Sequence, residues 1–186
     1  MQDFNYYLIT DPSYYTNDTK QFEEKLMPIL KSKRVDIACF RDKTSSNIQE
    51  LAKVFINTCK KHDIKNIFIN QNMQIAKELN FDGVHLTSLQ FDKIQEAKEL
   101  GLKIIISCHT FEEIQKAINL KVDKVTYSPI FFSPNKGEPK GIEKLQEAVD
   151  RFDIDIIALG GIISEVQIKQ IEQTNAKGFA SIRYFI

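Results

Sequence analysis

Short runs of β-forming and apolar residues alternate along the chain with segments of helical apolar spacing. The strand-type runs cover residues 5–10, 35–40, 66–70, 83–86, 103–108, 124–128, 156–159 and 178–181. Between them, apolar residues recur three or four positions apart, as in Phe22, Leu26 and Ile29, which is typical of amphipathic helices. Strict alternation of this kind predicts an α/β fold with a parallel sheet.

Eight strand-type runs favour a compact (β/α)8 TIM barrel, although such barrels usually need about 250 residues. We therefore expect shortened helices and little room for an eighth helix around Tyr184. The alternative, an open doubly wound sheet, is weakened because no Gly-x-Gly-x-x-Gly follows the first run. No Gly/Ser linker or block of charge divides the chain, so we expect residues 1–186 to form a single domain.

The composition argues against several classes of partner. The chain has 25 Lys and Arg against 25 Asp and Glu, so no overall positive charge favours nucleic acid or an anionic membrane. No apolar run approaches the roughly 20 residues of a membrane span, and the start lacks a signal-peptide pattern. Three cysteines without metal-type spacing (Cys39, Cys59 and Cys108) suggest reduced thiols. We therefore expect a cytoplasmic protein without nucleic-acid or membrane partners. Whether the barrel forms a homodimer is left open.

Polar residues follow the strand-type runs, and in a barrel these positions share one rim. The candidate site residues are Arg41, Lys43, Asn70, Ser107, His109, Ser133, Asn135, Lys136, Gly160, Gly161 and Ser181. Taken singly, each has an ordinary interpretation as a solvated charge, a helix cap or a tight turn. Together, cations, hydroxyls and glycines on one rim favour phosphate binding, because backbone N–H groups near glycine approach closely while Lys supplies charge. Gly160, Gly161 and Ser181 end the seventh and eighth runs, where barrels often hold phosphate.

Six segments resemble, in order and spacing, the motifs of the thiamine phosphate synthase/TenI family. They are Tyr7-Leu8-Ile9-Thr10, Phe40-Arg41-Asp42-Lys43, Ile69-Asn70, Asp82-Gly83-Val84-His85-Leu86, Ser128-Pro129-Ile130-Phe131 followed by Lys136, and Ala158-Leu159-Gly160-Gly161-Ile162. The resemblance runs over nearly the whole chain and implies the family's (β/α)8 barrel. It also implies a thiazole phosphate as the small-molecule ligand.

The synthase branch of that family joins a hydroxymethylpyrimidine diphosphate to a thiazole phosphate and expels pyrophosphate. The resemblance implies two carboxylates for its Mg²⁺, but the corresponding positions here are Gln71 and Gln90. A neutral amide is a poor substitute for a carboxylate on a hard dication. Asp92 would serve only if its loop shifted. Cys39 stands where the family motif has Gln, and its role is left open.

The TenI branch isomerises a thiazole carboxylate phosphate by proton transfer, without a metal or other cofactor. Ser107-Cys108-His109-Thr110 resembles that branch's Ser-Val-His-Ser segment. An imidazole with a pKa near 6.5 both accepts and donates a proton around neutrality. Our main hypothesis is therefore a thiazole tautomerase that uses His109. The alternatives are a thiamine phosphate synthase, which alone would need Mg²⁺, and a non-catalytic or regulatory phosphate binder. For His85, a packing role in the fourth strand and a functional role are equally open.

Overall fold

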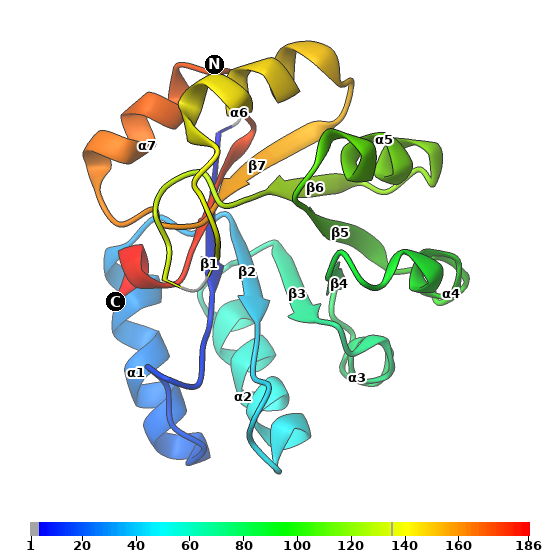
Figure 1. The fold of residues 1–186 in the computed structure, drawn as a ribbon. Helices are drawn as coiled ribbons and strands as arrows, with labels where there is room; N and C mark the ends of the chain where they lie inside the picture. The colour runs from blue at the N-terminus through cyan, green and yellow to red at the C-terminus, as the bar shows by residue number, and fades with distance from the viewer. Residues whose placement is uncertain (1–3, 135) are drawn as a thin grey trace.

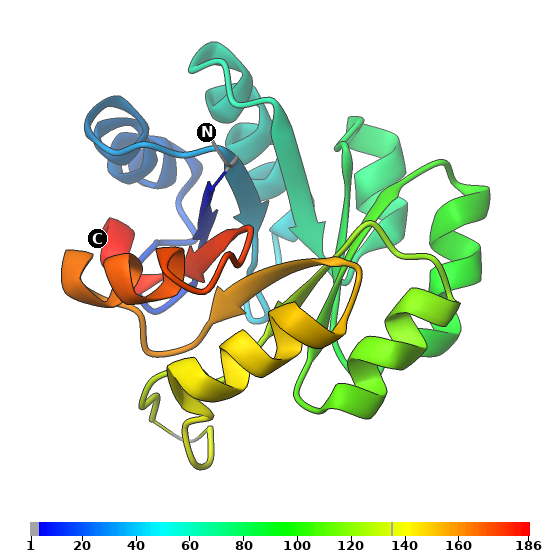
Figure 2. The same ribbon diagram turned by 90° about the horizontal axis from the view of Figure 1, so that it is seen from above.

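The computed structural model describes residues 4–134 and 136–186. Eight parallel strands close into a barrel in chain order, with β1 paired to both β2 and β8. The strands are β1 (Asn5–Ile9), β2 (Ile37–Phe40), β3 (Asn66–Asn70), β4 (Gly83–Leu86), β5 (Lys103–Cys108), β6 (Lys124–Tyr127), β7 (Asp155–Leu159) and β8 (Gly178–Ser181). The helices surround them on the outside (Figures 1 and 2). The predicted (β/α)8 TIM barrel is confirmed.

The helices are short, as the chain length requires. They are α1 (Thr19–Ser32), α2 (Ile48–Lys61), α3 (Met73–Leu79), α4 (Ile94–Glu99), α5 (Phe111–Asn119), α6 (Gly141–Arg151) and α7 (Glu165–Glu172). A single 3-10 turn, η1 (Phe91–Lys93), precedes α4, and another, η2 (Arg183–Phe185), follows β8. The turn η2 occupies the position of an eighth helix, which agrees with the expectation from the sequence. No helix among the described residues is both long and apolar enough to cross a membrane.

The apolar residues form two separate clusters, because successive strand residues point to opposite faces of the sheet. The larger cluster lies between the sheet and the helices and includes Phe22, Phe55 and Phe179. The smaller cluster fills the barrel interior and comprises Tyr7, Ile9, Ile37, Cys39, Phe68, Ile105, Ile157 and Ala180. The interior is therefore a packed core, and a ligand has access only at the two ends of the barrel.

An aspartate stands directly before β2, β4 and β6 and bonds to the preceding strand. Asp36 Oδ2 accepts the N–H of Tyr6 at 2.9 Å, while its own N–H donates to the carbonyl of Tyr6 at 2.9 Å. Asp82 makes the same pair of bonds with Ile67, and Asp123 with Ile104. In each case the partner is the second residue of the preceding strand. Strand β2 accordingly begins at Ile37, two residues later than the sequence run that starts at residue 35.

Lys177 occupies the equivalent place before β8. Its N–H donates to the carbonyl of Ile156, the second residue of β7, at 2.8 Å. A lysine side chain has no acceptor. The pair β7 and β8 therefore has the backbone hydrogen bond of the other three pairs but lacks the bond from a strand N–H to a carboxylate.

Candidate active site

The sequence-predicted residues gather at the carboxyl-terminal mouth of the barrel, each at or just after the end of a strand. Arg41 and Lys43 follow β2, Asn70 ends β3, Ser107 and His109 lie at the end of β5, Ser133 and Lys136 follow β6, Gly160 and Gly161 follow β7, and Ser181 ends β8. Asn135 lies outside the described residues. The β6–α6 loop, yellow-green in Figure 1, contributes Ser133 and Lys136.

Three cationic side chains, Arg41, Lys43 and Lys136, follow strand ends at this mouth. The pKa of Lys43 is lowered first by partial burial and then by the positive charges of Arg41 and Lys136. Lys43 and Lys136 come from loops that follow strands four apart in the barrel, and both loops project from the same mouth. Arg41 is also paired with the carboxylate of Asp11. Neither Lys43 nor Lys136 forms an ion pair among the described residues, which suits an anionic ligand at this mouth.

Gly160 and Gly161 allow the β6–α6 loop to pack against the turn after β7. Their φ angles are +97° and +71°, a region that side chains with a Cβ rarely adopt. A Cβ on Gly161 would lie 2.3 Å from the carbonyl oxygen of Phe132, and one on Gly160 would lie 2.8 Å from Pro129 Cα. Among the turn and loop hydrogen bonds of the described residues, none is donated by the N–H of either glycine. Phosphate binding at these two N–H groups stays a prediction.

Ser181 holds two segments of this rim together. Its hydroxyl donates to the carbonyl of Ile162 at 2.7 Å and accepts the N–H of Tyr184 at 3.2 Å. The side chain is buried, and its one hydroxyl hydrogen is already engaged. Ser181 therefore positions the turn after β7 against η2. Its contact with phosphate stays a prediction and would use the backbone, because the hydroxyl hydrogen is engaged.

His109 is fixed by the neighbouring strand β6. Its Nδ1 lies 3.1 Å from the carbonyl oxygen of Ser128 and 3.2 Å from that residue's Oγ. A carbonyl only accepts, so the bond to it places the ring hydrogen on Nδ1 and leaves the Nε2 lone pair available in the neutral ring. The backbone N–H of His109 donates to the carboxylate of Glu113. This half-buried imidazole is thus oriented as a proton acceptor.

A chain of hydrogen bonds runs through the barrel interior toward the mouth. Tyr7 Oη lies 2.8 Å from His85 Nδ1, His85 Nε2 lies 3.1 Å from Ser107 Oγ, and Thr126 Oγ1 donates to Ser107 Oγ at 3.4 Å. Tyr7, His85 and Thr126 are buried, whereas Ser107 is partly exposed. The chain thereby connects a buried imidazole to a hydroxyl near the ligand mouth. These four residues lie at inward-facing positions of β1, β4, β5 and β6. The alternation of residues along each strand indicates such positions, but the sequence analysis did not use it to predict this chain.

Acid should destabilise the fold through His85. Burial, and secondarily the charge of Arg41, lowers the pKa of His85 from 6.5 to about 4. The unfolded chain then binds the extra proton between these values, so stability is full above pH 6.5 and falls by up to about 3 kcal/mol as the pH approaches 4. Denaturant unfolding across this window should show the slope, and His85→Gln should remove it. An unchanged slope in that variant would contradict the assignment.

The two amides at the family's carboxylate positions are engaged within the protein. Gln71 Nε2 donates to Asn70 Oδ1 at 3.4 Å, and Asn70 Nδ2 donates to the carbonyl of His85 at 3.0 Å. Gln90 Oε1 accepts from both the N–H and the hydroxyl of Thr87, at 3.1 and 3.2 Å. These neutral groups do not make the oxygen-rich anionic set that Mg²⁺ favours.

The nearby carboxylates do not replace them. Asp42 uses both oxygens on the following turn, where it accepts from Thr44 and Ser45. Asp92 is exposed in η1. Among the described residues, no group of three or more His, Cys, Asp or Glu is arranged to hold a metal ion. The residues at this mouth therefore do not fit a Mg²⁺ ion held in the way that the family resemblance implies.

Comparison with known proteins agrees with the fold of the barrel. A family model described as thiamine monophosphate synthase matches residues 6–185. A putative thiamine-phosphate synthase 2 from Aquifex aeolicus is 32% identical, covering 97% of this chain and 96% of the relative. The thiamine-phosphate synthase of Halalkalibacterium halodurans is 30% identical, covering 98% of this chain and 86% of the relative.

A solved structure extends the likeness to three dimensions. Thiamine phosphate pyrophosphorylase from Pyrococcus furiosus superposes with a TM-score of 0.81 over 97% of this chain and 86% of that chain. At 23% identity, this comparison supports the fold alone. The match of the family model over nearly the whole chain carries the assignment: the chain belongs to the thiamine monophosphate synthase family.

Proposed function

We propose that the mouth binds a thiazole phosphate and a pyrimidine diphosphate and joins them into thiamine phosphate, with release of pyrophosphate. The observation that carries this proposal is that Arg41, Lys43 and Lys136 all follow strand ends at the same mouth, which provides more cationic groups than one phosphate requires. The relatives named as thiamine-phosphate synthases support the same reaction. This conclusion favours what the sequence analysis held as its alternative.

In this reaction the ring nitrogen of the thiazole forms a bond to the methylene carbon of the pyrimidine. The bond from that carbon to the diphosphate oxygen breaks, and pyrophosphate departs with the electron pair. Negative charge therefore grows on the leaving group, where cations already held in position stabilise it without reorganising. We assign this role to Arg41, Lys43 and Lys136. The N–H groups of Gly160 and Gly161 would hold the phosphate of the thiazole.

We also propose that the leaving group is neutralised by side chains alone. Gln71 and Gln90 bring no negative charge to the mouth, and both amides are bonded to neighbours. No step of the proposed reaction passes through a metal ion. Excess EDTA should accordingly leave the reaction rate unchanged.

Thiazole tautomerisation is the second candidate, favoured by the orientation of His109. The tautomer forms when a proton leaves one ring carbon and another is delivered nearby. An imidazole held through Nδ1, with Nε2 free to accept, supports both steps. The amides Gln71 and Gln90 are equally compatible with this metal-free reaction.

A single set of assays separates the candidates. Purified protein is given thiazole phosphate with pyrimidine diphosphate, and separately the thiazole carboxylate phosphate, each in parallel with added Mg²⁺ and with EDTA. We expect coupling in the wild type and a loss of about tenfold or more in kcat/KM for the diphosphate in Lys43→Gln, the effect of one charge-assisted contact. Lys53→Gln, which removes an exposed lysine on α2, should match the wild type.

The other outcomes are equally informative. Tautomerisation without coupling would replace the synthase proposal with the second candidate. Thiazole phosphate binding without either reaction would indicate a non-catalytic binder. Coupling abolished by EDTA would overturn the metal-free proposal alone.

A further inference from the structure

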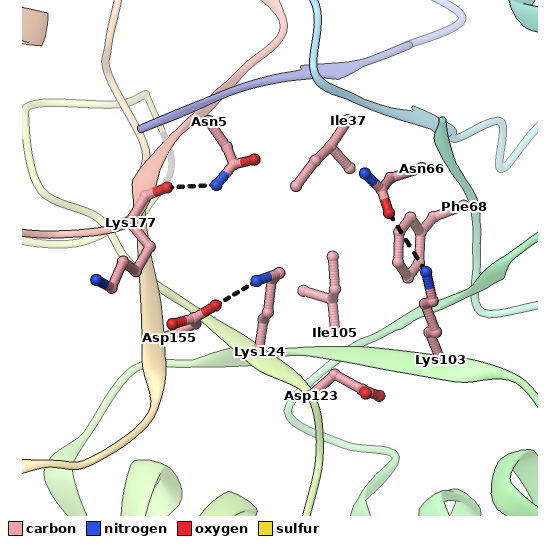
Figure 3. Close-up of a pocket in the computed structure, with 10 residues that line it drawn as sticks. All are labelled: Asn5, Ile37, Asn66, Phe68, Lys103, Ile105, Asp123, Lys124, Asp155 and Lys177. Carbon is pink, nitrogen blue, oxygen red and sulfur yellow. Dashed lines mark hydrogen bonds and ion pairs between the residues drawn. The ribbon is translucent and has the colours of Figure 1, made fainter. Parts of the chain in front are cut away.

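A cavity opens at the amino-terminal end of the barrel, opposite the candidate active site (Figure 3). Its volume is about 660 Å³, within the range of roughly 300–1,000 Å³ that small-molecule sites occupy. Active sites of this fold lie at the carboxyl-terminal mouth, so the reaction proposed above leaves this cavity without a role.

The polar wall of this cavity comes from residues that begin strands. Asn66 is the first residue of β3, Lys103 of β5, Lys124 of β6 and Asp155 of β7. Their side chains surround the same space, and Figure 3 shows the nitrogen atoms of Asn66, Lys103 and Lys124 around it. The amino ends of several strands thereby supply several hydrogen-bond donors to one cavity.

The floor of the cavity is apolar and closed. Ile37, Phe68 and Ile105 line it, and their relative exposures are only 1%, 3% and 0%. The same three residues belong to the packed interior of the barrel. They separate this cavity from the mouth, so a ligand here would occupy a site distinct from the active site.

Three lysines (Lys103, Lys124 and Lys177) and two aspartates (Asp123 and Asp155) line the cavity, so its charged lining has one cation in excess. Lys124 is paired with Asp155. Lys103 Nζ lies 3.4 Å from the amide oxygen of Asn66, and no carboxylate of the described residues lies within ion-pair distance of it. A neutral amide oxygen at that distance does little to balance an ammonium group. The wall therefore favours an anionic group placed between Lys103 and Lys124.

We propose that this cavity binds a small organic anion with an apolar body. The anionic group, a carboxylate or a phosphate monoester, lies between Lys103 and Lys124 and accepts from their ammonium groups. The apolar body lies in the cavity above Ile37, Phe68 and Ile105, beside the alkyl chains of Lys103 and Lys124. Inorganic phosphate lacks such a body and binds more weakly, because it has no apolar surface of its own to remove from water.

The test uses phenyl phosphate as the probe and the isoleucine methyl groups as the readout. Protein labelled with ¹³C at the Ile δ1 methyl groups is titrated, with Ile37→Val and Ile105→Val assigning the two floor signals. We expect both signals to shift saturably with phenyl phosphate. Benzoate distinguishes a carboxylate ligand from a phosphate ligand, and inorganic phosphate should bind at least tenfold more weakly than phenyl phosphate.

Two charge variants make the test specific. Lys103→Glu should weaken the binding of phenyl phosphate at least tenfold, whereas Lys53→Glu, the same change on exposed α2, should not. Lys136→Ala removes a cation from the mouth and should leave the floor shifts unchanged. The proposal is overturned if Ile37 and Ile105 do not shift, or if Lys103→Glu titrates like the wild type. The readout requires no turnover, so it stands apart from the proposed reaction.

Discussion

Under the second candidate function, His109→Asn should lower the rate of thiazole tautomerisation by about 10²–10⁴, the usual contribution of a positioned general acid–base. Asparagine keeps a polar group near the Ser128 carbonyl but has no group that titrates near neutrality. The binding of thiazole phosphate should therefore remain nearly unchanged. Coupling to the pyrimidine removes no proton, so the same variant should alter the synthase rate little. Single-turnover kinetics of both reactions, together with calorimetric binding, measure these effects.

The matched control is His62→Asn. His62 also places Nδ1 against a carbonyl, that of Thr58, at 3.0 Å, but it caps α2 away from the strand ends of the mouth. This variant should leave both reactions unchanged. Full tautomerase activity in His109→Asn would remove His109 from the mechanism, and equal losses in both reactions would indicate structural damage.

Gly161→Ala should destabilise the protein by about 2–5 kcal/mol. Part of this effect is the cost of placing a Cβ at a φ of +71°, about 1–2 kcal/mol. The rest comes from the 2.3 Å approach to the Phe132 oxygen, which forces the β6–α6 loop to move, at a cost of about 1–3 kcal/mol. Thermal unfolding should show a loss of roughly 4–20 °C. Displacement of this loop should also weaken binding at the mouth, because the loop carries Lys136.

Gly101→Ala separates the two contributions. Gly101 has a φ of +73°, yet nothing lies within 4 Å of the position of an added Cβ. This variant should show the backbone cost alone. If both variants lost the same stability, the close packing of the β6–α6 loop on the turn after β7 would not be what requires glycine at position 161.

The barrel could be predicted well from the sequence because the patterns that indicate its strands and helices are local and recur along the chain. Each strand makes an apolar run, each helix a periodic stripe, and a parallel arrangement puts all carboxyl ends on one rim. Four of the predicted strand ranges coincide with the observed strands, and the difference at β2 follows from the bonds of Asp36. The same logic gathered most of the candidate site residues at one mouth.

Relations between loops were beyond this reasoning. The ion pair of Arg41 with Asp11 depends on loop conformations that no periodicity encodes. His85 illustrates a different limit. Its residue type fits either packing or chemistry, and only its hydrogen bonds to Tyr7 and Ser107 reveal a connected chain. Likewise, the engagement of the Ser181 hydroxyl with Ile162 could not be read from the sequence.

The aspartates before β2, β4 and β6 divide the barrel into modules of two strands. Asp36, Asp82 and Asp123 each close one module by reciprocal bonds to the first strand of the same pair. A chain break just before β3, β5 or β7 leaves all of these aspartate bonds intact. The same holds whether the break arises by duplication, circular permutation or exchange between relatives. The fourth pair of strands, with Lys177 in place of aspartate, lacks the carboxylate bond and is closed by the backbone bond alone.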